Sequence, residues 1–230
     1  MKILRMFSTL IRIYPEDIIP YHLLMRPDRV KLLLDRFTFQ KHEIPPFQEA
    51  ETPRVLNFRS GEIEIEGNLV VIDQLNFLER RILVKIIGST HELNSVFTAI
   101  SSTLEDILDG FSLVSQKAIL QTDQTDCMIE LDIDYMSLFS LKFRKFIKNN
   151  LPKKIPYKVD IVTPKRLTFE LSFIQPIEYR GRNIALSPRL FTIEPRENTA
   201  LGDRIFFTSS PCPSDVHISL IKEFEEAFKM

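Results

Sequence analysis

The chain has 230 residues and a formal net charge of −1, and 44% of its residues are hydrophobic and 27% are charged. Intrinsic disorder requires low hydrophobicity together with a high net charge, so this composition predicts a folded, soluble protein. The near-zero net charge argues against a protein coated in positive charge, although it is compatible with a local basic patch.

The chain contains two cysteines, Cys127 and Cys212, which are too far apart for a C-x-x-C motif. Two isolated thiols are typical of a reducing compartment, so we expect a cytoplasmic protein. The N-terminal apolar run is interrupted by Arg12, and no small-residue cleavage site follows it. No apolar stretch reaches the ~20 residues of a membrane helix. We therefore expect neither a signal peptide nor contact with a membrane.

Residues 40–53 contain prolines and polar residues in a pattern typical of a connector. This pattern predicts an N-terminal segment and connector over residues 1–52, with a helix near residues 28–37. The main α+β domain is then expected over residues 53–230. A single compact domain over residues 1–230 is the alternative.

Short alternating runs begin after residue 54. Residues 62–66 alternate glutamate with isoleucine, as a half-buried strand does. Gly67 and Asn68 predict a tight turn, and residues 69–74 are expected to return as the partner strand.

A strand followed by a long helix is predicted next. Residues 82–87 form an apolar run that ends at Gly88. Ser89 and Glu92 then have the spacing of a capping box, which marks the start of a helix. The residues after them place an apolar stripe on one helical face, namely Leu93, Val96, Phe97, Ile100, Leu104, Ile107 and Leu108. Gly110 is expected to end this helix.

A second helix and several short strands are predicted downstream. The predicted elements are strands at 116–122, 127–133, 157–163 and 167–173, a turn at 123–126 and a helix at 136–150. In order, residues 81–163 then read strand, helix, strand, strand, helix, strand. That order predicts a ferredoxin-like β-α-β-β-α-β core, extended by additional antiparallel strands and a C-terminal helix.

The last third of the chain is less regular. Residues 190–194 and 204–208 are expected to be strands, and Ser214 is expected to cap the C-terminal helix. We detect no internal repeat in the sequence.

A basic run is the first candidate for a binding site. It holds Lys142, Arg144, Lys145, Lys148, Lys153, Lys154, Lys158, Lys165 and Arg166, with Asp160 as its only acid. Such a run can bind polyanions, because neutralising phosphates releases counterions. The competing interpretation is that these side chains solvate a helix and its exit loop, where cations also suit the helix dipole. A strand between them is expected to divide the run into two smaller patches.

An acidic run is the second candidate. Strand spacing places Glu130, Asp132 and Asp134 on one face, and carboxylates in that arrangement can hold Mg²⁺ for phosphoryl chemistry. However, Glu62, Glu64 and Glu66 alternate in the same way, and half-exposed strands often carry charges outward.

Known catalytic motifs are missing from the sequence. His217 and Ser219 match one H-x-S element of the two-histidine phosphoesterases, but the second element that such enzymes need is absent. His217 also falls in the first turn of a predicted helix, where we expect a solvated side chain. The chain has no Walker A loop, no G-x-S-x-G elbow and no H-E-x-x-H motif.

These observations leave three hypotheses, and we expect no cofactor for the preferred one. The preferred one is a non-enzymatic interaction protein, a subunit or adaptor that binds a protein partner or forms a homo-oligomer. The second is a nucleic-acid-binding module that uses residues 142–166. The third is a metal-dependent phosphoryl-transfer enzyme that uses the acidic strand at 130–134.

Overall fold

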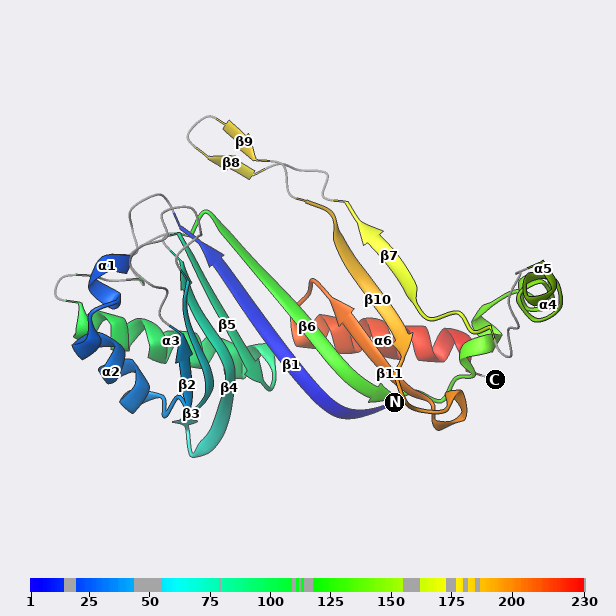
Figure 1. Ribbon diagram of the computed structural model, residues 1–230, viewed down its shortest axis with the longest axis horizontal. Helices are drawn as coiled ribbons and strands as arrows, with labels where there is room; N and C mark the ends of the chain where they lie inside the picture. Colours follow the sequence, from blue (N-terminus) through cyan, green and yellow to red (C-terminus); the bar gives the residue numbers. More distant parts are fainter. Residues whose placement is uncertain are drawn as a thin grey trace.

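The structure, a computed structural model, describes residues 1–14, 20–43, 55–78, 80–108, 111, 113, 118–154, 162–172, 177–179, 182–184 and 187–229. Within these residues the protein is a mixed α+β structure with one large antiparallel sheet and a C-terminal helix (Figure 1). The predicted class is therefore confirmed at this level.

The sheet has nine strands in the order β2-β3-β4-β5-β1-β6-β11-β10-β7. The strands are β1 (Lys2–Ile13), β2 (Lys41–Glu43), β3 (Leu56–Ile65), β4 (Asn68–Leu78), β5 (Arg81–Ile87), β6 (Leu120–Glu130), β7 (Leu167–Leu171), β10 (Arg189–Pro195) and β11 (Ile205–Ser210). A separate small hairpin is formed by β8 (Ile177–Tyr179) and β9 (Arg182–Ile184).

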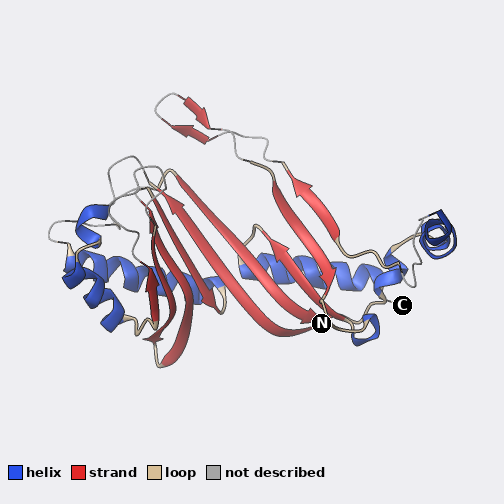
Figure 2. Ribbon diagram, in the orientation of Figure 1, coloured by secondary structure: helices blue, strands red, loops and turns tan. Residues whose placement is uncertain are grey.

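Two long helices lie on the same face of the large sheet. These are α3 (Thr90–Ile107) and α6 (Ser214–Phe228), and Figure 2 shows both behind the strands. Shorter helical elements lie at the two ends of the molecule. They are α1 (Tyr21–Leu24), α2 (Pro27–Arg36), η1 (Tyr135–Leu138), α4 (Leu141–Lys145), η2 (Phe146–Asn150), α5 (Leu151–Lys154) and η3 (Leu201–Asp203).

Helix α3 begins where the sequence predicts it. The Ser89 hydroxyl accepts a hydrogen bond from the Glu92 N–H (3.3 Å), and the Glu92 carboxylate accepts one from the Ser89 N–H (2.7 Å). This reciprocal pair is the predicted capping box. The predicted apolar stripe is buried against the sheet, and the helix ends at Ile107. Gly110 lies outside the described residues.

The predicted hairpin is present, but its turn is displaced by one residue. Glu66 and Gly67 form the two-residue loop between Ile65 and Asn68, and both have positive φ (51° and 80°). A two-residue loop of this kind requires left-handed backbone at both positions, which suits glycine at the second.

The two halves of the chain have the same order of elements. Each half starts with a central strand (β1 or β6) and continues through helical turns and outer strands to an inner strand (β5 or β11). Each then ends in a long helix (α3 or α6). The antiparallel pair β1–β6 lies at the centre of the sheet, so the two halves are related by an approximate two-fold axis between these strands (Figure 1).

Individual hydrogen bonds repeat across this axis. Ser8 in β1 is paired directly with Thr125 in β6. The Ser8 hydroxyl donates to the Gly88 carbonyl (2.8 Å), and the Thr125 hydroxyl donates to the Cys212 carbonyl (2.8 Å). Gly88 and Cys212 each stand two residues before the first residue of a long helix, Thr90 or Ser214. The structural repeat therefore extends to single residues, although we detect no internal repeat in the sequence.

The predicted ferredoxin-like core over residues 81–163 is not seen. The turn expected at 123–126 lies inside β6, which is one continuous strand. Polar residues can form a strand here because β6 is paired with β1 along one edge and β11 along the other. The strand expected at 157–163 falls mostly on residues outside the described ranges.

Two further elements differ from the sequence prediction. The helix expected at 136–150 is divided into η1 and a separate run from Leu141 to Lys154, since Phe139 has extended backbone (φ −106°, ψ 140°). Residues 2–13, which the prediction placed in an N-terminal segment, form the central strand β1.

Candidate binding surfaces

One face of the sheet is covered by α3 and α6, and no other described element lies in front of the central strands on the opposite face (Figure 1). We call this opposite face the open face. Its centre is lined by apolar side chains that are only half-buried, including Phe7, Ile11, Leu83, Ile87, Met128 and Phe207. The strand register places Phe7 beside Ile87, and Met128 beside Phe207. The open face therefore carries apolar side chains on both sides of the two-fold axis, and we call them the apolar strip. At the axis itself Phe7 and Thr9 face the polar residues Asp126 and Gln124 of β6.

Charged groups on the open face are mixed in sign and largely paired. The Arg5 guanidinium and the Lys85 ammonium each lie 4.6 Å from the centre of the Phe7 ring. Lys85 also forms an ion pair with Asp73 (3.3 Å). Asp126 accepts hydrogen bonds from the Ser209 hydroxyl (2.6 Å) and the Gln124 amide (3.0 Å). This pattern suits a protein surface better than a polyanion, which needs an excess of positive charge.

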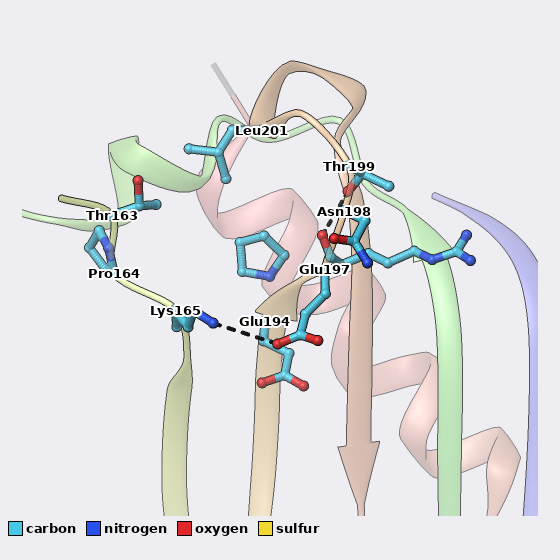
Figure 3. Close-up of a pocket in the computed structure, with 10 residues that line it drawn as sticks. Thr163, Pro164, Lys165, Glu194, Glu197, Asn198, Thr199 and Leu201 are labelled. Carbon is cyan, nitrogen blue, oxygen red and sulfur yellow. Dashed lines mark hydrogen bonds and ion pairs between the residues drawn. The ribbon is translucent and has the colours of Figure 1, made fainter. Parts of the chain in front are cut away.

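A hollow of about 510 Å³ lies where β10 ends, and Figure 3 shows its lining. Lys165 points toward Glu197 and forms an ion pair with it (3.6 Å). The neighbouring Arg166 binds Glu194, with 2.6 Å between Nε and a carboxylate oxygen. The two cations of this end of the basic run are thus matched by two acids.

The structure divides the predicted basic run. The exposed side chains of Lys142, Lys145, Lys148 and Lys153 lie on the helical segment from α4 to α5, and Arg144 there is half-buried. Lys165 lines the hollow described above, and Arg166 beside it is bound to Glu194. The Lys154 side chain and all of Lys158 lie outside what the structure describes. Only the helical part therefore presents several cations together.

The predicted acidic set is also separated. Asp132 is bound by the Arg204 guanidinium. Asp134 accepts a hydrogen bond from the Met136 N–H (3.0 Å) and caps η1, while Glu130 ends β6. Across the described residues no three His, Cys, Asp or Glu side chains are grouped so as to hold a metal ion.

His217 is buried, which corrects the expectation of a solvated side chain. Its Nε2 lies 2.9 Å from the Thr208 hydroxyl, and its Nδ1 lies 2.6 Å from the Ser210 hydroxyl. Burial lowers the pKa of His217 to about 4, so the imidazole is neutral at pH 7. Thr208 and Ser210 are two residues apart on β11, so their hydroxyls lie on the same face of the strand. This period-two spacing is the only feature of the sequence that indicates their contact with His217.

The thiol of Cys127 is also buried. Burial raises the pKa of Cys127 to about 12, so almost none of it is the nucleophilic thiolate at neutral pH. His217 and Cys127 therefore act as packing and hydrogen-bonding groups of the core beneath α6.

No protein-family model matches this sequence, and no curated protein is significantly similar to it. Among the helices that the structure describes, none is long and apolar enough to cross a membrane.

Proposed function

We propose that this chain is a non-enzymatic interaction protein, a subunit or adaptor that binds a protein partner through its open face. The observation that carries the proposal is the one-sided sheet. Both long helices cover one face, while the centre of the other is an apolar strip lined by side chains such as Phe7, Leu83 and Met128.

A partly exposed apolar strip is a cost to a protein that stays alone in water. Contiguous apolar patches of several hundred Å² on a protein surface commonly mark interaction sites. Burial of apolar surface contributes roughly 25 cal/mol per Å² before the costs of association are subtracted. Lys85 and Asp126 lie among these apolar side chains, and each has a polar partner, Asp73 for Lys85 and the Ser209 hydroxyl for Asp126.

The test compares a variant of the strip with a matched variant elsewhere. Leu83→Asp places a charge on the open face, and Leu32→Asp places the same charge on the exposed side of α2. Each tagged protein is used to purify partners from a lysate of the cells that naturally produce it. The affinity of each protein for the recovered partner is then measured by isothermal titration calorimetry. We expect the wild type and Leu32→Asp to bind alike, and Leu83→Asp to bind about tenfold more weakly or worse. Equal binding by all three would contradict the proposal.

Nucleic acid is the second candidate, and the exposed lysines of the segment from α4 to α5 support it. Fluorescence anisotropy with single- and double-stranded DNA and RNA at ~50 mM salt tests it, because electrostatic binding is strongest at low salt. Binding at micromolar concentration that is lost in Lys145→Glu/Lys148→Glu would favour this candidate over the protein partner.

A further inference from the structure

The outer flanks of the two long helices differ sharply in exposure. Val96 and Leu104 are the seventh and fifteenth residues of α3, and Leu220 and Phe228 occupy the same positions in α6. The α3 residues are 0% and 1% exposed, whereas Leu220 and Phe228 are each 40% exposed. The approximate two-fold axis makes these positions equivalent, so α6 lacks a cover that α3 has.

In the first half the cover is the chain between the first two long strands. Helix α2 packs beside α3 and buries Val30 and Leu33. The residues after α2 continue the contact onto β3, where the Phe39 ring lies directly over Gly61. An amphipathic helix and its exit thus fill the groove between the long helix and the outer strand.

In the second half, the described helices α4 and α5 do not cover the equivalent place (Figure 1). Strand β7 is the equivalent of β3. Strand β3 is separated from the inner strand β5 by β4, and β7 is separated from the inner strand β11 by β10. Phe169 of β7 is 46% exposed, and its ring contacts Phe191, with 6.0 Å between centroids. Phe191 in turn lies 6.2 Å from the ring of His217 on α6, so Phe169 is on the helix-covered face. Leu220, Phe169 and Leu171 are therefore exposed apolar side chains on the helix-covered side of the sheet, and we call the surface that they share between α6 and β7 the groove.

The segment that should fill this groove stands away from it. The run from α4 to α5 follows β6 as α1 and α2 follow β1, and Figure 1 shows it well separated from α6 and β7. Its residues Leu141, Phe143 and Phe146 are 66%, 42% and 45% exposed. A cavity of about 400 Å³ lies between this segment and residues Val162 and Leu201, and Ile147 is the one buried residue of the described run from α4 to η2.

We propose that the groove between α6 and β7 binds the segment from Leu141 to Lys154 of a second copy of this chain, in a reciprocal exchange. Within one chain the segment is kept outside by a row of aromatic rings, in which Phe139 contacts both the buried Tyr135 (5.5 Å) and Phe143 (5.3 Å). A second copy is not limited in this way. A two-fold exchange covers both apolar surfaces of each chain at once, whereas an unrelated partner would cover only one.

The charges of the two surfaces are complementary. The exposed side chains of Lys142, Lys145 and Lys148 lie along the segment. Beside Leu220 on α6 lies the exposed acid Glu223, whereas Glu170 of β7 alternates with Phe169 and faces the other side of the sheet. Lysines that meet Glu223 beside the apolar contact favour this occupant over an acidic or a nucleic-acid one. The proposal does not depend on the open face, which lies on the other side of the sheet.

The test uses one variant on each side of the contact. Leu220→Asp disables the groove and Phe146→Asp disables the segment, while Leu32→Asp is the control for a charge at an exposed helical leucine. Light scattering after size-exclusion chromatography and sedimentation velocity measure the oligomeric state. We expect a dimer for the wild type and the control, and a dissociation constant raised about tenfold or more in each single variant. Circular dichroism and urea unfolding establish that the variants fold.

Mixing the two variants gives the decisive result. A mixed dimer retains one intact contact, made by the segment of the Leu220→Asp chain in the groove of the Phe146→Asp chain. We therefore expect dimer to reappear on mixing. A wild type that is monomeric at all concentrations, or folded single variants that dimerise as the wild type does, would overturn the proposal. If Leu83→Asp no longer binds the partner of the open face but still forms the dimer, the two surfaces act independently.

Discussion

Thr90 and Ser214 exchange hydrogen bonds across the approximate two-fold axis. The Thr90 N–H donates to the Ser214 hydroxyl (3.0 Å), and the Ser214 N–H donates to the Thr90 hydroxyl (2.8 Å). Both are the first residues of their helices, so each supplies an acceptor for a backbone N–H that has no partner inside its own helix. The starts of α3 and α6 are thereby joined at the centre of the molecule, and each half completes the other.

Removing either hydroxyl should destabilise the fold. Thr90→Val leaves the buried N–H of Ser214 without an acceptor, and Ser214→Ala does the same to Thr90. We expect each change to lower the free energy of unfolding by about 1–3 kcal/mol. Urea unfolding measures this, and Thr90→Ser, which keeps the hydroxyl, serves as the control. A Thr90→Val protein as stable as Thr90→Ser would show that the exchange contributes nothing.

His217 should make the stability of the protein depend on pH. Its pKa is about 4 in the folded state and near 6.5 when unfolded, so between these values the unfolded chain binds more protons. The stabilisation is fully present above about pH 6.5 and is lost as the pH falls toward 4. We expect it to amount to about 2 kcal/mol between pH 7 and pH 5.

The measurement is the free energy of unfolding at about pH 7 and pH 5 for the wild type and His217→Gln. Glutamine can still bond to the hydroxyls of Thr208 and Ser210 but does not titrate. The variant should therefore lose less stability on acidification than the wild type does. His42→Gln, at an exposed histidine, should behave as the wild type. Identical pH slopes for wild type and His217→Gln would refute the assignment.

Phe97 should contribute strongly to the core of the first half. It is buried on α3, and the Arg12 guanidinium lies 4.0 Å from the centre of its ring. We expect Phe97→Ala to cost about 3–5 kcal/mol, because truncation leaves a cavity and removes the ring from Arg12. Leu69→Ala, at a well-exposed position, is the control. An unchanged urea midpoint for Phe97→Ala would show that the ring is not packed as described.

Replacing Asp132 should not change metal binding, because we interpret this side chain as an ion-pair partner and not as a metal ligand. Its partner is the Arg204 guanidinium, and both side chains are substantially exposed. We expect Asp132→Asn to change the free energy of unfolding by less than about 1 kcal/mol, as is usual for exposed ion pairs. Calorimetric titration with Mg²⁺ or Mn²⁺ should detect no binding to either protein. Metal binding by the wild type that disappears in Asp132→Asn would favour the phosphoryl-transfer hypothesis.

Local patterns in the sequence determined the elements that depend on near neighbours. The capping box at Ser89 and Glu92 and the stripe through Phe97 need only residues of one helix, and both are found where the sequence places them. The hairpin at Gly67 depends on two residues with left-handed backbone. In each case the stabilising contacts lie within a few positions along the chain, so spacing alone reveals them.

Only the tertiary structure decided how these elements are combined. Residues 123–126 have turn-like composition, yet they lie within β6 because β1 pairs with all four and β11 also pairs with Thr125 and Asp126. The pairing of Ser8 with Thr125 joins residues that share no local pattern, and it places the two-fold axis. The same axis gives Leu220 the place of Val96 while leaving it exposed. Such relations depend on contacts between distant parts of the chain, and the side-chain period of one element carries no information about them.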